Sequence, residues 1–88
     1  MKQNLKTSIA ENFKNTELGF LRIKRNLKID SYSDLKTENH LKKIILSTPL
    51  ERIETIGKNY YFRNNKYNAV LTVNSHSLTV ITAKKINA

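Results

Sequence analysis

The chain contains no cysteine and only two histidines, two glycines and one proline. Without a thiol it cannot form a disulfide framework, a thiolate metal site or a cysteine nucleophile. Two histidines give no recognisable metal-ligand spacing, and two glycines leave no glycine-rich loop for phosphate. We therefore expect no metal and no cofactor, which sets the usual cofactor-dependent enzymes aside.

Long hydrophobic runs are also missing. No stretch reaches the ~20 apolar residues of a membrane span, and the first residues lack the apolar core of a signal peptide. We expect a cytoplasmic protein of a bacterial or phage-infected cell, without membrane contact. A length of 88 residues with 39% hydrophobic residues fits a single domain, residues 1–88, around one small core.

Acidic residues are scarce, with seven Asp and Glu against sixteen Lys and Arg, so the formal net charge is +9. Residues 55–88 contain no Asp or Glu at all, and their cations are Lys58, Arg63, Lys66, Lys84 and Lys85. This much charge on a small domain repels itself, and the phosphates of a partner would relieve the repulsion. The charge favours nucleic acid or a nucleoprotein as partner, and a plain solvated basic surface is the alternative.

The spacing of apolar residues changes near Pro49. Before it, apolar residues recur at helical intervals, which predicts helices over about 2–13, about 16–27 and within 34–47. Asn15 is the expected N-cap of the second helix, and Ser33 or Thr37 that of the third.

After Pro49 the pattern alternates and is rich in β-branched and aromatic residues. It predicts strands over 52–56, 59–63, 67–73 and 77–83, separated by turn-forming residues. Short connections make neighbouring strands antiparallel. The predicted fold is α+β, with two or three N-terminal helices packed on a four-stranded antiparallel β-meander.

The alternation also assigns the two faces of this sheet. In the last strand it places Leu78, Val80 and Thr82 on one face, and Ile81 and Ala83 on the other. We expect the helices to cover one face and the other to be at least partly open.

Three motifs carry a resemblance to a known family: TELGFLRIKRNL at 16–27, GKNYY at 57–61 and LTVNSHSLTVITA at 71–83. Together they resemble a family of small bacterial proteins catalogued as domain of unknown function 3781, which implies no settled activity. By layout, helices followed by a four-stranded sheet, the chain also resembles the barnase, colicin and RelE group of small ribonucleases. That second likeness implies a metal-independent ribonuclease of the toxin type.

The family pattern includes two histidines whose matching positions here hold Lys14 and Lys84. Two candidate proton-transfer groups of the family pattern are therefore absent. Lys84 suits phosphate stabilisation better than proton abstraction, because an ordinary lysine has a pKa near 10.4.

Cleavage of RNA needs a base, an acid and cations aimed at the charge that develops on phosphorus. We expect His76 and Lys84 as candidate catalytic residues, with His40 a weaker candidate, although histidines in turns and on helix surfaces are usually just solvated. The candidate nucleic-acid contacts are Arg22, Arg25, Lys58, Tyr60, Arg63, Thr82 and Lys84. Solvated helix faces, core packing and β-propensity are the ordinary explanations for the same residues.

Two hypotheses of function remain open. The first is a small basic module that binds nucleic acid, RNA above all, or a nucleoprotein complex, with RNA cleavage as its sharper form. The second is a non-enzymatic inhibitor, of the phage anti-defence or anti-CRISPR type, that docks on a nucleic-acid-guided effector.

Overall fold

A computed structural model describes the backbone of residues 2–86 and the side chains of residues 5–86. Its first half consists of three α-helices and a short 3₁₀ helix: α1 (Lys2–Asn12), α2 (Glu17–Leu27), α3 (Asp34–Ser47) and η1 (Leu50–Arg52). None of these helices has the length and apolar character needed to cross a membrane.

The second half is a four-stranded sheet: β1 (Ile53–Ile56), β2 (Asn59–Asn64), β3 (Ala69–Asn74) and β4 (Val80–Lys85). The strands are antiparallel and follow one another in the order β1-β2-β3-β4. The predicted α+β layout of helices on an antiparallel meander is thus confirmed.

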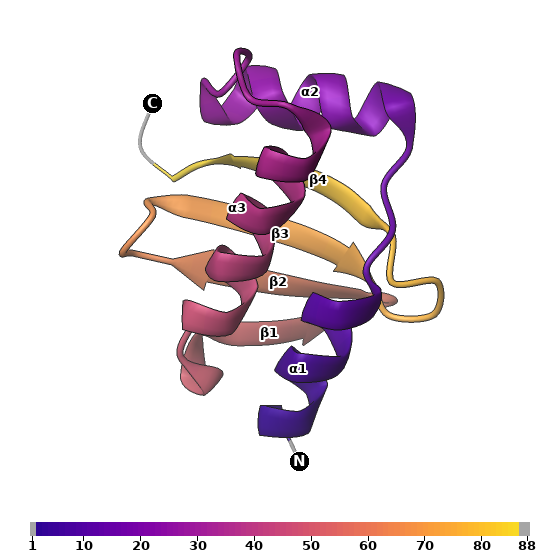
Figure 1. Ribbon diagram of the computed structural model, residues 1–88. Helices are drawn as coiled ribbons and strands as arrows, with labels where there is room; N and C mark the ends of the chain where they lie inside the picture. Colours follow the sequence, from indigo (N-terminus) through magenta and orange to yellow (C-terminus); the bar gives the residue numbers. More distant parts are fainter. Residues whose placement is uncertain (1, 87–88) are drawn as a thin grey trace.

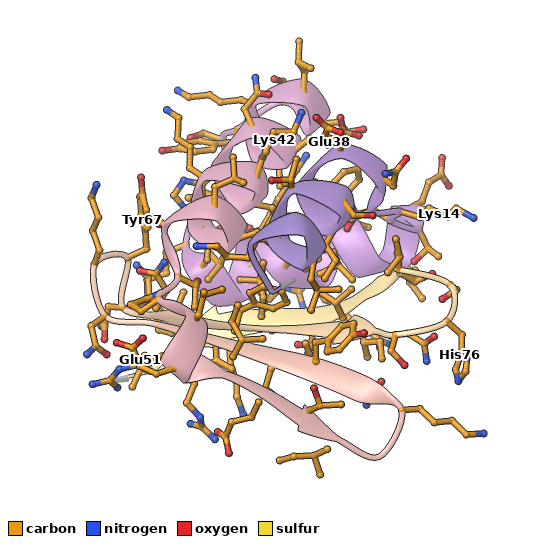
Figure 2. The ribbon with its side chains drawn as sticks, turned by 90° about the horizontal axis from the view of Figure 1, so that it is seen from below. Lys14, Glu38, Lys42, Glu51, Tyr67 and His76 are labelled. Atoms are coloured by element: carbon orange, nitrogen blue, oxygen red, sulfur yellow. The ribbon has the colours of Figure 1, made fainter. Side chains whose placement is uncertain are left out.

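All three helices lie on one side of the sheet. α1 and α3 cross in front of the strands, and α2 runs along β4 (Figure 1). The core lies between these layers, where Ile9, Ile23 and Leu41 of the helices and Phe62 and Leu71 of the sheet are fully buried. Within residues 2–86, no helix covers the opposite face of the sheet, where the strands present their own side chains (Figure 2).

The helix starts show which small polar residues act as caps. Thr16, rather than the expected Asn15, caps α2: its Oγ1 accepts a hydrogen bond of 2.9 Å from the Gly19 N–H. A Cβ at Gly19 would lie 2.8 Å from that oxygen, so the cap needs a glycine at this position. Ser33 caps α3, as expected, by accepting from the Lys36 N–H.

A β-bulge in β4 changes which side chains share a face. Thr72 pairs with Thr82 but Val73 pairs with Val80, so Ile81 is the extra residue between the two pairs. Val80 and Ala83 are buried on the helix side, whereas Ile81 is 49% exposed. The expected strict alternation, with Thr82 beside Val80, is therefore wrong beyond the bulge.

A lysine of α1 stabilises the C-terminal end of α3. The Lys6 side chain is buried, and its Nζ donates to the backbone oxygens of Leu46, at 3.1 Å, and Thr48, at 3.0 Å. A cation is favourable at this position because the last carbonyl groups of a helix carry partial negative charge.

Asn64, at the end of β2, binds the same helix end from the sheet side. Its Nδ2 lies within hydrogen-bond distance of the Ile44 oxygen, Ser47 Oγ and Thr48 Oγ1, at 3.0, 2.9 and 3.1 Å. Its Oδ1 accepts from the Tyr67 N–H at 2.9 Å. The side chain is only 1% exposed, so its hydrogen bonds are made without competition from water.

Replacing Asn64 with alanine is expected to lower the free energy of unfolding by about 2 kcal/mol, because the partly buried Tyr67 N–H loses its partner and the buried hydrogen bond to the Ile44 oxygen is lost. Urea unfolding followed by circular dichroism measures the change. The neighbouring Asn65 is exposed, so Asn65→Ala is the matched control and should change stability by at most about 0.5 kcal/mol. Equal stability of the two variants would contradict the anchoring role of Asn64.

Candidate nucleic-acid interface

The open face of the sheet contains a groove of about 470 Å³ that runs over β2, β3 and β4. Polar and aromatic side chains make up most of its walls, with two aliphatic residues among them. The lining residues are Asn59, Tyr61, Arg63, Val70, Thr72, Ile81, Thr82 and Lys84.

The register of the strands sets the order of these side chains. Tyr61, Thr72 and Thr82 form one row across the sheet. Arg63 and Lys84 belong to the next row, on either side of Val70. An aromatic ring, two hydroxyl groups and two cations therefore lie close together, which is a combination that can stack on a base and contact its phosphates.

One carboxylate lies at this face as well. Arg63 Nε is 2.8 Å from Glu54 Oε1, and both side chains are about half exposed. Glu54 precedes the stretch without carboxylates, so the charge pattern of residues 55–88 did not reveal it. In the part of the chain that the structure describes, Lys84 is the groove's only cation without an ion pair.

Three of the expected nucleic-acid contacts, Arg63, Thr82 and Lys84, meet in this groove. Tyr60 does not. It pairs with Val73 and packs against the core, half-buried, while its neighbour Tyr61 faces the groove. Tyr61, rather than the candidate Tyr60, therefore borders the groove, because successive residues of a strand point to opposite faces.

The other expected contacts lie outside the groove. Arg22 and Arg25 are exposed on α2, the helix that runs along β4 (Figure 1). Lys58 lies in the β1–β2 turn, where its backbone oxygen accepts a 2.8 Å hydrogen bond from the Ser75 N–H. That bond joins the β1–β2 turn to the β3–β4 turn, which carries the exposed His76.

The structure does not bring His76 and Lys84 together. His76 lies in the turn before β4, and Lys84 lies near the other end of that strand. The strand residues between Val80 and Lys84 account for roughly 13 Å. The two residues therefore build no shared proton-transfer site, and the catalytic role of each stays a prediction.

Lys14, the other position where the family pattern has a histidine, lies beside the start of β4. Its backbone N–H donates to the Leu78 oxygen and its oxygen accepts from the Val80 N–H, at 3.0 and 2.9 Å. Lys14 and Lys84 are thus also separated by the length of β4.

A group of aromatic side chains that the sequence analysis does not predict lies at the end of the sheet opposite His76. His40 of α3 lies edge-on between Tyr32 and Tyr67, with ring centroids 5.9 and 5.4 Å apart. Lys36 Nζ is 4.3 Å from the centre of the Tyr32 ring, and Lys66 Nζ is 5.7 Å from that of Tyr67. Figure 2 shows Tyr67 and His76 at opposite ends of the molecule.

We call this group the His40 cluster; it comprises Tyr32, Lys36, His40, Lys43, Lys66, Tyr67 and Lys85. Its α3 members follow one another at intervals of four and three residues, a spacing that places them on one helix face. That spacing was a sequence signal for the cluster. The contributions of Tyr67 and Lys85 depended on the tertiary structure.

The surroundings of His40 favour its neutral form. Its half-buried position lowers its pKa below the ordinary 6.5, and the positive charges of Lys85 and Lys43 lower it further. His40 is therefore uncharged at neutral pH and presents one ring nitrogen as a donor and the other as an acceptor.

With helices on one face of an antiparallel meander and a polar groove on the other, the protein is a small two-layer α+β module. The chain belongs to the family described as protein of unknown function DUF3781, whose model matches residues 7–84. No curated protein and no solved structure matches the chain. The likeness to the barnase, colicin and RelE ribonucleases is accordingly not confirmed.

The lowered pKa of His40 predicts a pH dependence of stability. Below the unfolded-state value of about 6.5, the unfolded chain binds a proton that the folded chain does not yet bind. Stability contributed by His40 is therefore full above that pH and is lost as the pH falls toward the folded-state pKa. His40→Gln should therefore reduce the fall of the melting temperature between about pH 7 and pH 5.

Thermal melts of the parent and of His76→Gln, at the exposed second histidine, provide the comparison for this test. The parent and His76→Gln should lose melting temperature together over this range. A slope that His40→Gln leaves unchanged would contradict the assignment to His40.

Proposed function

We propose that the protein binds single-stranded RNA on the open face of its sheet. The observation that carries the proposal is the groove on the helix-free face, where the Tyr61 ring lies among Arg63, Thr82 and Lys84. Small proteins bind single strands by stacking bases on aromatic side chains of an exposed surface while cations follow the phosphates. The net charge of +9 supplies the attraction at longer range.

The Arg63–Glu54 ion pair is compatible with this role. Both partners are about half exposed, and an exposed pair of this kind contributes at most about 1 kcal/mol. A phosphate can therefore replace Glu54 as the partner of Arg63 at little cost. Glu54 would then disfavour loose, non-specific anions while permitting a ligand that also stacks on Tyr61.

Binding has better support than cleavage. Cleavage without a metal requires a base and an acid on the two sides of one phosphate. The two expected catalytic residues, His76 and Lys84, lie toward opposite ends of β4. The groove offers contacts for an RNA strand, whereas His76 and Lys84 lie too far apart to act on one phosphate.

Tyr61→Ala should weaken binding of labelled single-stranded RNA roughly 5- to 150-fold, the equivalent of about 1–3 kcal/mol of lost stacking. Lys84→Ala should reduce the slope of log affinity against log salt by about 0.7, as expected for one lost phosphate contact. Fluorescence anisotropy at several salt concentrations measures both quantities.

The matched control is Lys42→Ala, which removes one positive charge from the side of α3 that points away from the sheet (Figure 2). It should leave affinity and salt slope close to those of the parent. Absence of salt-dependent binding by the parent, or equal effects of Lys42→Ala and Lys84→Ala, would overturn the proposal. RNA that the parent cleaves and Lys84→Ala leaves intact would replace binding with a nuclease activity.

A second proposal, an inhibitor that docks on a nucleic-acid-guided effector, is favoured by apolar residues exposed on α2. Leu18 and Leu21 are 62% and 58% exposed. Leu21 also borders a hollow of about 270 Å³ between α2 and the start of α3. Leucines beside the exposed Arg22 and Arg25 suit the guide-binding subunit of such an effector, which offers apolar and phosphate groups together.

The paired substitution Leu18→Ser and Leu21→Ser should abolish recovery of such an effector in a nuclease-treated pull-down, because it removes the apolar contact area. Leu46→Ser is the control, since Leu46 is a large exposed residue on α3, and it should preserve recovery. Mass spectrometry must identify the captured protein as a guide-binding subunit. Recovery that nuclease treatment eliminates, or that both variants retain, contradicts docking through α2.

A further inference from the structure

The positive charge of the C-terminal strands gathers at one end of the sheet. β2 ends, β3 begins and β4 ends there, and the register places Arg63 and Lys84 in one row across Val70. Lys66 lies in the turn between β2 and β3, and Lys85 follows Lys84. Of the cations named for residues 55–88, only Lys58 lies at the opposite end.

The strand period divides this charge between the two faces. Lys84 points into the groove, whereas Lys85 lowers the pKa of His40, which lies on the helix side. Arg63 likewise faces the groove, while Asn64 is buried beneath α3. The groove and the His40 cluster therefore meet around the edge formed by the ends of β2 and β4.

The His40 cluster has the chemistry of a nucleotide-binding surface. Its lysines are all exposed, and within residues 5–86 none of them forms an ion pair with a carboxylate. They are Lys36, Lys43, Lys66 and Lys85. Because no carboxylate of these residues is paired with them, the four lysines are available to the phosphates of a ligand.

The aromatic members of the cluster provide a second kind of contact. Tyr32, His40 and Tyr67 are half-buried, so part of each side chain is accessible to solvent. Lys36 occupies the space over the Tyr32 ring through an exposed contact, which a stacked base can replace because stacking is the stronger interaction. The neutral imidazole of His40 adds a donor and an acceptor for a base edge.

We infer that the His40 cluster is a second RNA-contact site, which holds the part of a single strand that continues from the groove around the end of β2 and β4. This inference rests on the proposed function. It adds a defined path for the RNA strand along the protein, and it makes the contribution of the cluster to binding depend on RNA length. A short oligonucleotide fills the groove, and a longer one also reaches the cluster.

The test compares single-stranded oligonucleotides of about 4 and about 16 nucleotides, the range of site sizes seen in small single-strand binders. The variant is Lys66→Ala with Lys85→Ala, and the control is Lys14→Ala with Lys42→Ala. All four residues are exposed, and each pair removes the same charge. Lys14 lies at the His76 end and Lys42 on the outer side of α3 (Figure 2).

With the longer RNA, the cluster variant should lower the salt slope by about 1.4, corresponding to two lost phosphate contacts. With the shorter RNA, it should match the control. The imidazole NMR signals give an independent readout, because the chain has only two histidines. The signals of His40 should shift on addition of the longer RNA only, while those of His76 stay in place.

Failure of the second site and failure of the proposed function give different results. A cluster variant that matches the control on both RNAs, with Tyr61→Ala still impaired, overturns the second site and leaves the groove as the binding surface. A loss of equal size on both RNAs shows a general effect of charge and also overturns it. A parent protein that binds neither RNA removes the proposed function, and the second site with it.

Discussion

The hydrogen bonds of Asn64 fix the relation between the two layers of the protein. Its Nδ2 donates to the Ile44 oxygen in the last turn of α3, and its Oδ1 accepts from the Tyr67 N–H in the β2–β3 turn. One buried amide thus docks the helix on the sheet and shapes the turn that carries Lys66 and Tyr67. Since a buried polar group without a partner is costly, helix end and turn keep their positions together. Lys6 reinforces the same helix end from α1.

This anchor also determines where the proposed surfaces lie. Asn64 faces the helices, so the residue before it, Arg63, faces the groove on the open side. Lys84 and Lys85 are divided in the same way at the end of β4. The helix-covered face gives the protein its core, and the free face and its end present the aromatic and cationic groups. Stability and the proposed binding therefore depend on the same strand ends but use opposite sides of them.

Much of the architecture was predictable because it follows from local periodicity. Helical spacing before Pro49 and alternation after it predicted the right elements within a few residues. Three of the candidate contacts, Arg63, Thr82 and Lys84, line one groove, and their role in binding stays a prediction. Tyr60 was the candidate contact, but Tyr61 is the tyrosine that borders the groove. Two adjacent tyrosines fit either phase of the alternation, so the sequence pattern does not show which of them faces the helices. The bulge at Ile81 places Thr82 and Val80 on opposite faces of the sheet. Such a bulge is an irregularity of pairing between two strands, so the residue pattern of one strand does not predict it. Glu54 was overlooked, because its contact with Arg63 joins two strands.

The sequence by itself determined the secondary structure, the antiparallel order of strands joined by short turns, the excess of positive charge and membership of the family that its three motifs indicated. These properties depend on neighbours in the chain and on composition. Only the tertiary structure decided that Tyr61 rather than Tyr60 borders the groove, that His76 and Lys84 lie apart, and that His40 stands between Tyr32 and Tyr67. Those relations depend on which face the helices cover and on contacts between residues distant in the chain, which local spacing does not encode.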